Sequence, residues 1–235
     1  MRPIGFSTGA LAKSDFKAGL NLHTEEHLAI ELSALRESEI ANLVSEIASL
    51  SLGQFQHVSV HAPSQRVELS ESELFEQLES LAPFVDGIVV HPDLIIEVDN
   101  WKVLGERAYI ENMDNRKPIG RTVDELQPFF DALPAARFCL DLGHAWQIDP
   151  TMRLATELLH AFHSRLAELH ISEVDADSRH RPISSKAAND FRAVAELIPE
   201  NIPAIIESEV QHDELQTELR IVQFALGDVD SIEAS

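Results

Sequence analysis

The 235-residue chain has one cysteine and no long apolar run. The single cysteine, Cys139, excludes an intramolecular disulfide framework and is typical of a reducing compartment, so we expect a cytoplasmic protein. It lies in the apolar run Phe138-Cys139-Leu140, which favours a packed strand residue over a nucleophile. No apolar stretch reaches the roughly 18 residues of a membrane span, and residues 1–5 lack the apolar region of a signal peptide.

Basic residues are also scarce. Lysine and arginine together number 18, against 40 aspartates and glutamates, which gives a formal net charge of −22. Such a field repels nucleic acid phosphates and anionic membranes at long range, and no cluster of basic residues opposes it. We therefore expect a small-molecule substrate and no nucleic acid or membrane partner, although solubility alone would also explain the acidity.

Two further absences concern the fold. No Gly-x-Gly-x-x-Gly follows a strand-like segment, which counts against a dinucleotide-binding fold, and no Gly/Ser/Pro linker divides the chain. The length fits one α/β barrel of about 250 residues. We expect residues 1–235 to form a single (β/α)8 TIM barrel with an acidic tail after about residue 226.

Short β-type runs alternate with helical stretches along the chain. The runs cover residues 4–8, 28–34, 57–61, 87–91, 107–111, 137–141, 166–171 and 203–207. Helical periodicity or a hydroxyl cap predicts helices over residues 38–52, from 70 onward, and over 122–132, 150–164, 184–198 and 212–225. Segment 9–26 is too polar and glycine-punctuated to predict a helix. Eight strand–helix units favour a closed parallel barrel over an open doubly wound sheet.

Histidines and carboxylates stand at the carboxyl ends of six of the eight runs. They are His61, His91, Glu111, Asp141 (followed by His144), His170 and Glu207. Each residue alone fits an ordinary hydrogen-bonded or solvated rim group. Parallel barrels carry their active sites at this edge, however, and the narrow mouth brings side chains of facing strands together. The convergence therefore predicts a site at the C-terminal strand ends.

Three carboxylates in that mouth would repel one another without a counter-charge. Glu111, Asp141 and Glu207 would be neutralised by two divalent cations. Imidazole together with carboxylate favours zinc, manganese or iron over magnesium or calcium. We therefore expect two or three divalent metal ions (Zn, Mn or Fe).

The ligand order carries a family resemblance. His-Ala-Pro, His-Pro, Glu-Asn, Asp-x-x-His, His, Arg-His and Glu on successive strands resemble the xylose isomerase-like TIM barrels (AP endonuclease family 2), and in particular the endonuclease IV branch. The resemblance extends from about residue 57 to 207. It implies one metal held by Glu111, Asp141, His170 and Glu207. It implies a second metal held by His61 and His91 and bridged by Glu111.

The resemblance to endonuclease IV is incomplete at a third metal. That branch uses the Asp-x-x-His histidine and an Asp-Arg-His tripeptide, to which His144 and His180 correspond, but Ser178 stands in place of the aspartate. Asp175 or Asp177 would replace it after a loop shift. Alternatively, His180 and the flanking Arg179 and Arg181 contact an anionic substrate.

Other departures bear on DNA. The bulky residues that wedge into DNA after His-Ala-Pro in the repair enzymes are Ser64-Gln65 in this chain, and its loops are shorter. Abasic-site cleavage is therefore not the reading that we favour.

Three functions remain open at this point. The first is an isomerase or epimerase of a small sugar or sugar phosphate, in which Glu111 and Glu207 remove and return a proton beside a metal-polarised carbonyl. The second is an endonuclease IV-like phosphoesterase with several metals, in which Glu111 bridges. The third is a non-catalytic metal-binding barrel. We rank the isomerase narrowly first, and we expect two or more bound ions to favour hydrolysis.

Smaller expectations concern the surroundings. Asn112 is expected to touch substrate or orient Glu111, and Glu31 to accept a hydrogen bond from a ligand histidine. Residues 115–117 form either an anion site or a solvated basic turn. The histidine at position 57 receives no site role, and neither do those at positions 23, 27, 160, 163 and 212. Pairing of barrels through their outer helices stays open, because no long apolar helix face marks an interface.

Overall fold

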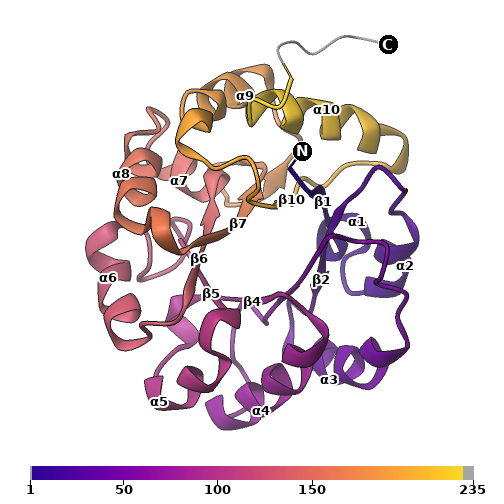
Figure 1. Cartoon of the computed structure of the whole chain (residues 1–235), viewed down its shortest axis with the longest axis vertical. Coiled ribbons are helices and arrows are strands. Elements are labelled where there is room, and N and C mark those ends of the chain that lie inside the picture. Colours follow the sequence, from indigo (N-terminus) through magenta and orange to yellow (C-terminus); the bar gives the residue numbers. More distant parts are fainter. Residues whose placement is uncertain (1, 230–235) are drawn as a thin grey trace.

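The computed structural model describes residues 2–229. Eight parallel strands close into a barrel in the spatial order β1-β10-β7-β6-β5-β4-β3-β2, and helices surround it (Figure 1). The barrel strands are β1 (Ile4–Ser7), β2 (Ala29–Ser33), β3 (His57–His61), β4 (Gly87–Val90), β5 (Ala108–Glu111), β6 (Arg137–Asp141), β7 (Leu166–Ile171) and β10 (Ala204–Ile206). All eight expected strands are present, and the expected (β/α)8 TIM barrel is confirmed.

Helices follow most of the strands and cover the outside of the barrel (Figure 1). They are α1 (Thr8–Ala12), α2 (Phe16–Asn21), α3 (Glu37–Glu46), α4 (Glu71–Leu81), α5 (Val98–Trp101), α6 (Val123–Ala132), α7 (Leu142–Ile148), α8 (Arg153–Phe162), α9 (Ser185–Arg192) and α10 (Leu215–Ala225). Short 3-10 segments continue several of them, for example Ile47–Ser49 after α3 and Ala195–Leu197 after α9. No helix within residues 2–229 is long and apolar enough to cross a bilayer.

The polar segment after β1 differs from expectation. It forms the two short helices α1 and α2 where we predicted none, because Asp15 caps α2 by accepting from the Ala18 backbone N–H at 2.9 Å and Phe16 is buried. Three other features escaped the periodicity, namely the short helix α5, the helix α7 directly after β6, and a small hairpin of β8 (Glu173–Val174) with β9 (His180–Arg181). The last two lie at the C-terminal end of the barrel strands. Of the expected acidic tail, residues 230–235 lie outside the described part of the chain.

Side chains alternate along each strand between two environments. In β3, Val58 and Val60 belong to the large apolar core, while His57, Ser59 and His61 occupy the other face. The same alternation in β7 sends Leu169 and Ile171 to the core and Glu168 and His170 to the opposite face. The inside of the barrel is therefore unusually polar, and its polar residues are almost fully buried.

Candidate metal centre

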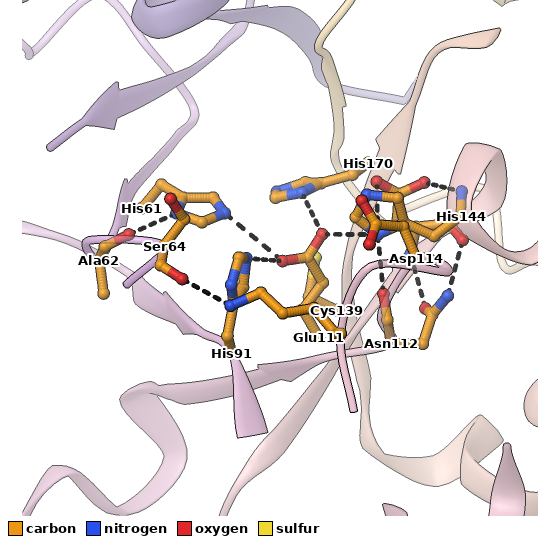
Figure 2. Close-up of polar contacts among 12 residues, drawn as sticks. His61, Ala62, Ser64, His91, Glu111, Asn112, Asp114, Cys139, His144 and His170 are labelled. Atoms are coloured by element: carbon orange, nitrogen blue, oxygen red, sulfur yellow. Dashed lines mark hydrogen bonds and ion pairs between the residues drawn. The ribbon is translucent and has the colours of Figure 1, made fainter. Parts of the chain in front are cut away.

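Glu111 stands at the middle of the site, at the end of β5, and is 1 % exposed. Its Oε2 lies 3.4 Å from His61 Nε2 and 3.1 Å from His91 Nε2. Its Oε1 lies 3.3 Å from His170 Nδ1 and 3.5 Å from His144 Nδ1. Figure 2 shows these histidines on either side of the carboxylate. The two oxygens of one side chain therefore serve two separate groups of nitrogen atoms.

Of the four groups of potential ligands in the described part of the chain, two share Glu111. The histidine set consists of His61, His91 and Glu111, and the carboxylate set consists of Glu111, Asp141, His170 and Glu207. Within each set one ligand atom from every residue lies within 4.8 Å of the others. The structure thus brings together six of the eight residues that we expected at metals, and Glu111 belongs to both sets.

The turn from β6 into α7 positions Asp141 at the site. Asp141 ends β6 and caps α7, because its Oδ1 accepts from the His144 backbone N–H at 2.7 Å. Gly143 permits this turn, since a Cβ atom there would lie 2.4 Å from the carbonyl oxygen of Ser172. Asn112 then exchanges two hydrogen bonds with the Asp141 main chain, at 2.8 and 2.9 Å. Its buried amide therefore ties β5 to β6 instead of facing the substrate cavity, where we had expected it.

Electrostatics at the site reflect the excess of buried carboxylates. Burial raises the pKa of Glu207 to about 8, with the charges of Asp141 and Glu31 adding to the rise although His170 opposes it. Burial lowers the pKa of His61, but Glu31 and Glu111 outweigh it and bring the value to about 9. The carboxylates of the site therefore favour positively charged partners.

The donor atoms fit divalent cations. Glu111 Oε2 and Asp141 Oδ2 are buried, and they accept no hydrogen bond from any residue between 2 and 229. Histidine nitrogens nevertheless lie close by, at 3.1 Å from Glu111 Oε2 and 3.3 Å from Asp141 Oδ2. Unsatisfied buried carboxylate oxygens are costly, and coordination of a cation by oxygen and nitrogen lone pairs would satisfy them.

The third expected ligand group is not assembled. The rings of His144 and His180 lie 5.6 Å apart, but neither residue joins three or more close ligand atoms in the described part of the chain. Ser178 turns its hydroxyl to Gln147 Nε2 at 2.7 Å. Asp175 binds Arg181 Nε at 2.8 Å, and neither it nor Asp177 lines the cavity. The carboxylate that the resemblance calls for is therefore missing here.

A cavity of about 560 Å³ opens above the two sets. Basic residues at its rim include Arg116, Lys117 and Arg179. Lys117 Nζ binds Asp93 Oδ2 at 2.8 Å and the Ser64 carbonyl at 2.6 Å, so it ties together three loops instead of forming a solvated turn. Arg181 does not line the cavity. The exposed guanidinium of Arg179 makes no hydrogen bond or ion pair with any residue between 2 and 229.

Three acidic or imidazole groups of the interior escaped the sequence reasoning. Glu168 is fully buried and contacts His170, and His57, to which we gave no site role, contacts Glu168. Asp114 is 2 % exposed, lines the cavity and binds Arg116. The two-residue period of a strand predicts the first two, since Glu168 precedes His170 by two positions and His57 precedes His61 by four. Asp114 lies in a loop, where no such period applies.

The chain is an α/β barrel of closed parallel strands, and its histidines and carboxylates gather at the carboxyl ends of those strands. The family model of the xylose isomerase-like TIM barrel matches residues 28–223, and the chain belongs to this family. Members of the family are enzymes, isomerases or epimerases and endonuclease IV among them, and they typically bind divalent metals. No curated protein matches the sequence.

Solved structures share the fold at low identity. Endonuclease IV from Thermus thermophilus superposes with a TM-score of 0.61 at 19 % identity, over 97 % of this chain and 100 % of that one. A putative sugar phosphate isomerase/epimerase from Anabaena variabilis gives 0.56 at 14 %, over 94 % and 88 %. A xylose isomerase-like TIM barrel protein from Mycobacterium smegmatis, in complex with magnesium, gives 0.54 at 16 %, over 96 % and 98 %.

Proposed function

We propose that this chain is a divalent-metal-dependent hydrolase that acts on a small phosphoester. The observation that carries the proposal is the division of Glu111 between two ligand sets, with Oε2 facing His61 and His91 and Oε1 facing His170. A one-metal isomerase has no use for the histidine set. A pair of cations bridged by one carboxylate is typical of phosphoryl hydrolysis.

Different residues of the site would bind the cations and the substrate. The histidine set and the carboxylate set would each hold one cation, and Glu111 would be a shared ligand and not a base. Bound cations supply Lewis-acid polarisation of a phosphoryl oxygen and lower the pKa of an attacking water. Arg179, at the cavity rim with its guanidinium unpaired within residues 2–229, would contact the phosphate oxygens.

The substrate that fits is small and anionic. The cavity of about 560 Å³ is the size of an ordinary small-molecule site, and the net charge of −22 opposes long nucleic acids. Arg116 already pairs with Asp114, and Lys117 with Asp93. Few basic side chains at the cavity therefore remain to bind the phosphates of a nucleic acid. We therefore propose a phosphorylated metabolite and not DNA.

One observation favours isomerisation as a second candidate. The carboxylate set contains four ligands from four strand ends, and it is complete without the histidine set. Glu207 and Glu111 both approach His170 Nδ1, at 3.6 and 3.3 Å, so both flank the same position. In that reading they would pass a proton across a bound hydroxy-carbonyl compound.

Metal counting together with one variant separates the two. We expect the wild-type protein, loaded with Zn²⁺ or Mn²⁺, to hold two ions and to hydrolyse members of a phosphomonoester and phosphodiester panel. His91→Asn should keep one ion and lose at least about 100-fold in hydrolysis. The matched control is His160→Asn, an exposed histidine on α8.

Three outcomes count against the hydrolase. One tightly held ion, with sugar-phosphate isomerisation that survives His91→Asn, would establish the second candidate instead. No turnover by the fully loaded protein on either panel would favour a non-catalytic metal-binding barrel. Absence of any bound transition metal would overturn the metal centre itself.

A further inference from the structure

A second layer of buried polar side chains lies directly beneath the candidate centre. His170 separates the two layers, because its Nδ1 faces Glu111 Oε1 at 3.3 Å while its Nε2 faces Glu168 Oε1 at 3.1 Å. Both His170 and Glu168 are 0 % exposed. The ring therefore has one nitrogen at the candidate metals and the other at a carboxylate inside the barrel.

Glu168 uses both of its oxygens. Oε1 contacts His170, and Oε2 lies 2.5 Å from Nε2 of His57, which is 7 % exposed. His57 Nδ1 lies 3.7 Å from Asp86 Oδ2, and the Asp86 side chain is 57 % exposed at the amino-terminal end of the barrel. A line of paired groups thus runs from that end, through the barrel interior, to the candidate centre.

Glu31 also approaches His170 Nε2, at 3.1 Å, but neither of its oxygens accepts a hydrogen bond from any residue between 2 and 229. The contact with Glu168 does meet hydrogen-bond geometry. Glu31 was the expected acceptor, and the structure gives that place to Glu168.

Packing does not explain this arrangement. Burying a carboxylate and two imidazoles in the middle of a barrel is costly unless each is paired, and apolar residues of the same size would fill the space at no such cost. A ligand histidine, by contrast, needs its proton on the nitrogen away from the metal, and a carboxylate acceptor fixes that tautomer and the plane of the ring. Glu168 stands where such an acceptor is required.

We infer that Glu168 and His57 are positioning residues, which hold His170 with its Nδ1 lone pair toward the carboxylate set. Glu168 accepts the Nε2–H of His170, and His57 holds the second oxygen of Glu168 from below. Neither touches the cavity, since neither lines it. The inference rests on the metal centre of the proposed function and adds two residues to it.

Metal affinity tests this without any substrate. Zn²⁺ and Co²⁺ are titrated against a chelator of known affinity for wild type, Glu168→Gln and the double variant His57→Gln/Glu168→Gln. We expect about 10–100-fold weaker binding of one ion, the one held by the carboxylate set, and little change in the other. The visible spectrum of the Co²⁺ protein should shift, because the His170 ring is no longer fixed.

The double variant guards against misfolding, since it removes both partners of the buried pair and leaves neither charge alone. Glu71→Gln is the matched control, because Glu71 is also buried, at 5 % exposure, and accepts from Trp101 Nε1 and the Ile96 backbone N–H, none of which belongs to either ligand set. It should bind both ions as wild type does.

Wild-type affinity and an unchanged Co²⁺ spectrum in folded Glu168→Gln or in the double variant would overturn the positioning role, while the two-metal centre would stand. A wild-type protein that binds neither ion would overturn the centre and the positioning role together. Two ions bound without phosphoester hydrolysis would overturn the proposed function alone.

Discussion

His91 Nε2 and Glu111 Oε2 lie 3.1 Å apart, and the same carboxylate presents its other oxygen to His170 on the far side. Glu111 is the one residue that the histidine set and the carboxylate set have in common, and every other ligand belongs to one of the two sets. Substitution of Glu111 should therefore change the number of bound metal ions differently from substitution of a ligand of one set.

We predict that Glu111→Gln loses both ions, whereas Asp141→Asn loses one. A neutral amide at position 111 removes a charge from both sets, but Asp141 belongs only to the carboxylate set. Metal analysis by mass spectrometry after dialysis against a fixed free Zn²⁺ concentration gives the counts. Exposed Glu76→Gln, on α4, is the control. Equal losses in Glu111→Gln and Asp141→Asn would contradict the shared role.

A third ion should be gained by restoring one carboxylate. Ser178 has φ 56°, a left-handed conformation that aspartate and asparagine tolerate, and it lines the same cavity as His144 and His180. Ser178→Asp is expected to raise the bound metal by up to one ion per chain, and Ser178→Asn, of the same size without charge, is expected to leave it unchanged. If both variants keep the wild-type count, the loop does not place residue 178 at the two histidines.

Stability should fall on mild acidification through His27. Burial, with the positive charge of His23, lowers the pKa of His27 to about 4. Because the folded value lies below the unfolded value of 6.5, the unfolded chain binds the proton first, and stability present above pH 6.5 is lost as the pH falls toward 4. From pH 7.5 to 5.0 the loss attributable to His27 is about 2 kcal/mol.

The comparison with His27→Asn isolates this effect, since other groups titrate in the same window. In the wild type, His27 Nδ1 accepts a hydrogen bond from the Thr24 backbone N–H at 3.1 Å. Asparagine at position 27 can still accept this hydrogen bond, but it takes up no proton. Urea unfolding with chelator present, at both pH values, should show a smaller pH dependence in the variant than in wild type. Identical slopes would exclude His27 as the source.

Glu71 should be a strong stability determinant far from the metals. It is 5 % exposed at the start of α4, and it accepts from Trp101 Nε1 at 2.7 Å and from the backbone N–H of Ile96 and Glu97. Glu71→Ala leaves the buried Trp101 indole N–H and two partly buried backbone N–H groups without this acceptor, which should cost about 2–4 kcal/mol of unfolding free energy. Glu76→Ala, exposed on the same helix, should change it by less than about 0.5 kcal/mol. Similar values for the two variants would show that water replaces the lost carboxylate.

Much of the fold can be predicted from patterns in short stretches of the sequence. The strands, the long helices and the residues at the strand ends could be predicted because hydrophobic period and caps are local properties, and a parallel barrel then forces strand ends to one rim. The same logic places Glu111, Asp141, His170 and Glu207 together, and the structure does bring them together. It failed in the segment after β1, where α1 and α2 are too short to show a period.

The tertiary structure alone decided which nitrogen faces which oxygen. The barrel and the set of residues at its mouth could be predicted from the sequence, because chain periodicity dictates which side chains point inward. The sequence by itself did not determine that Glu111 divides its oxygens between two sets, that Asn112 turns away to Asp141, or that Glu168 joins His170 to His57. Those relations join strands separated by up to 111 positions along the chain, and they depend on the register and closure of the barrel, which no local pattern encodes.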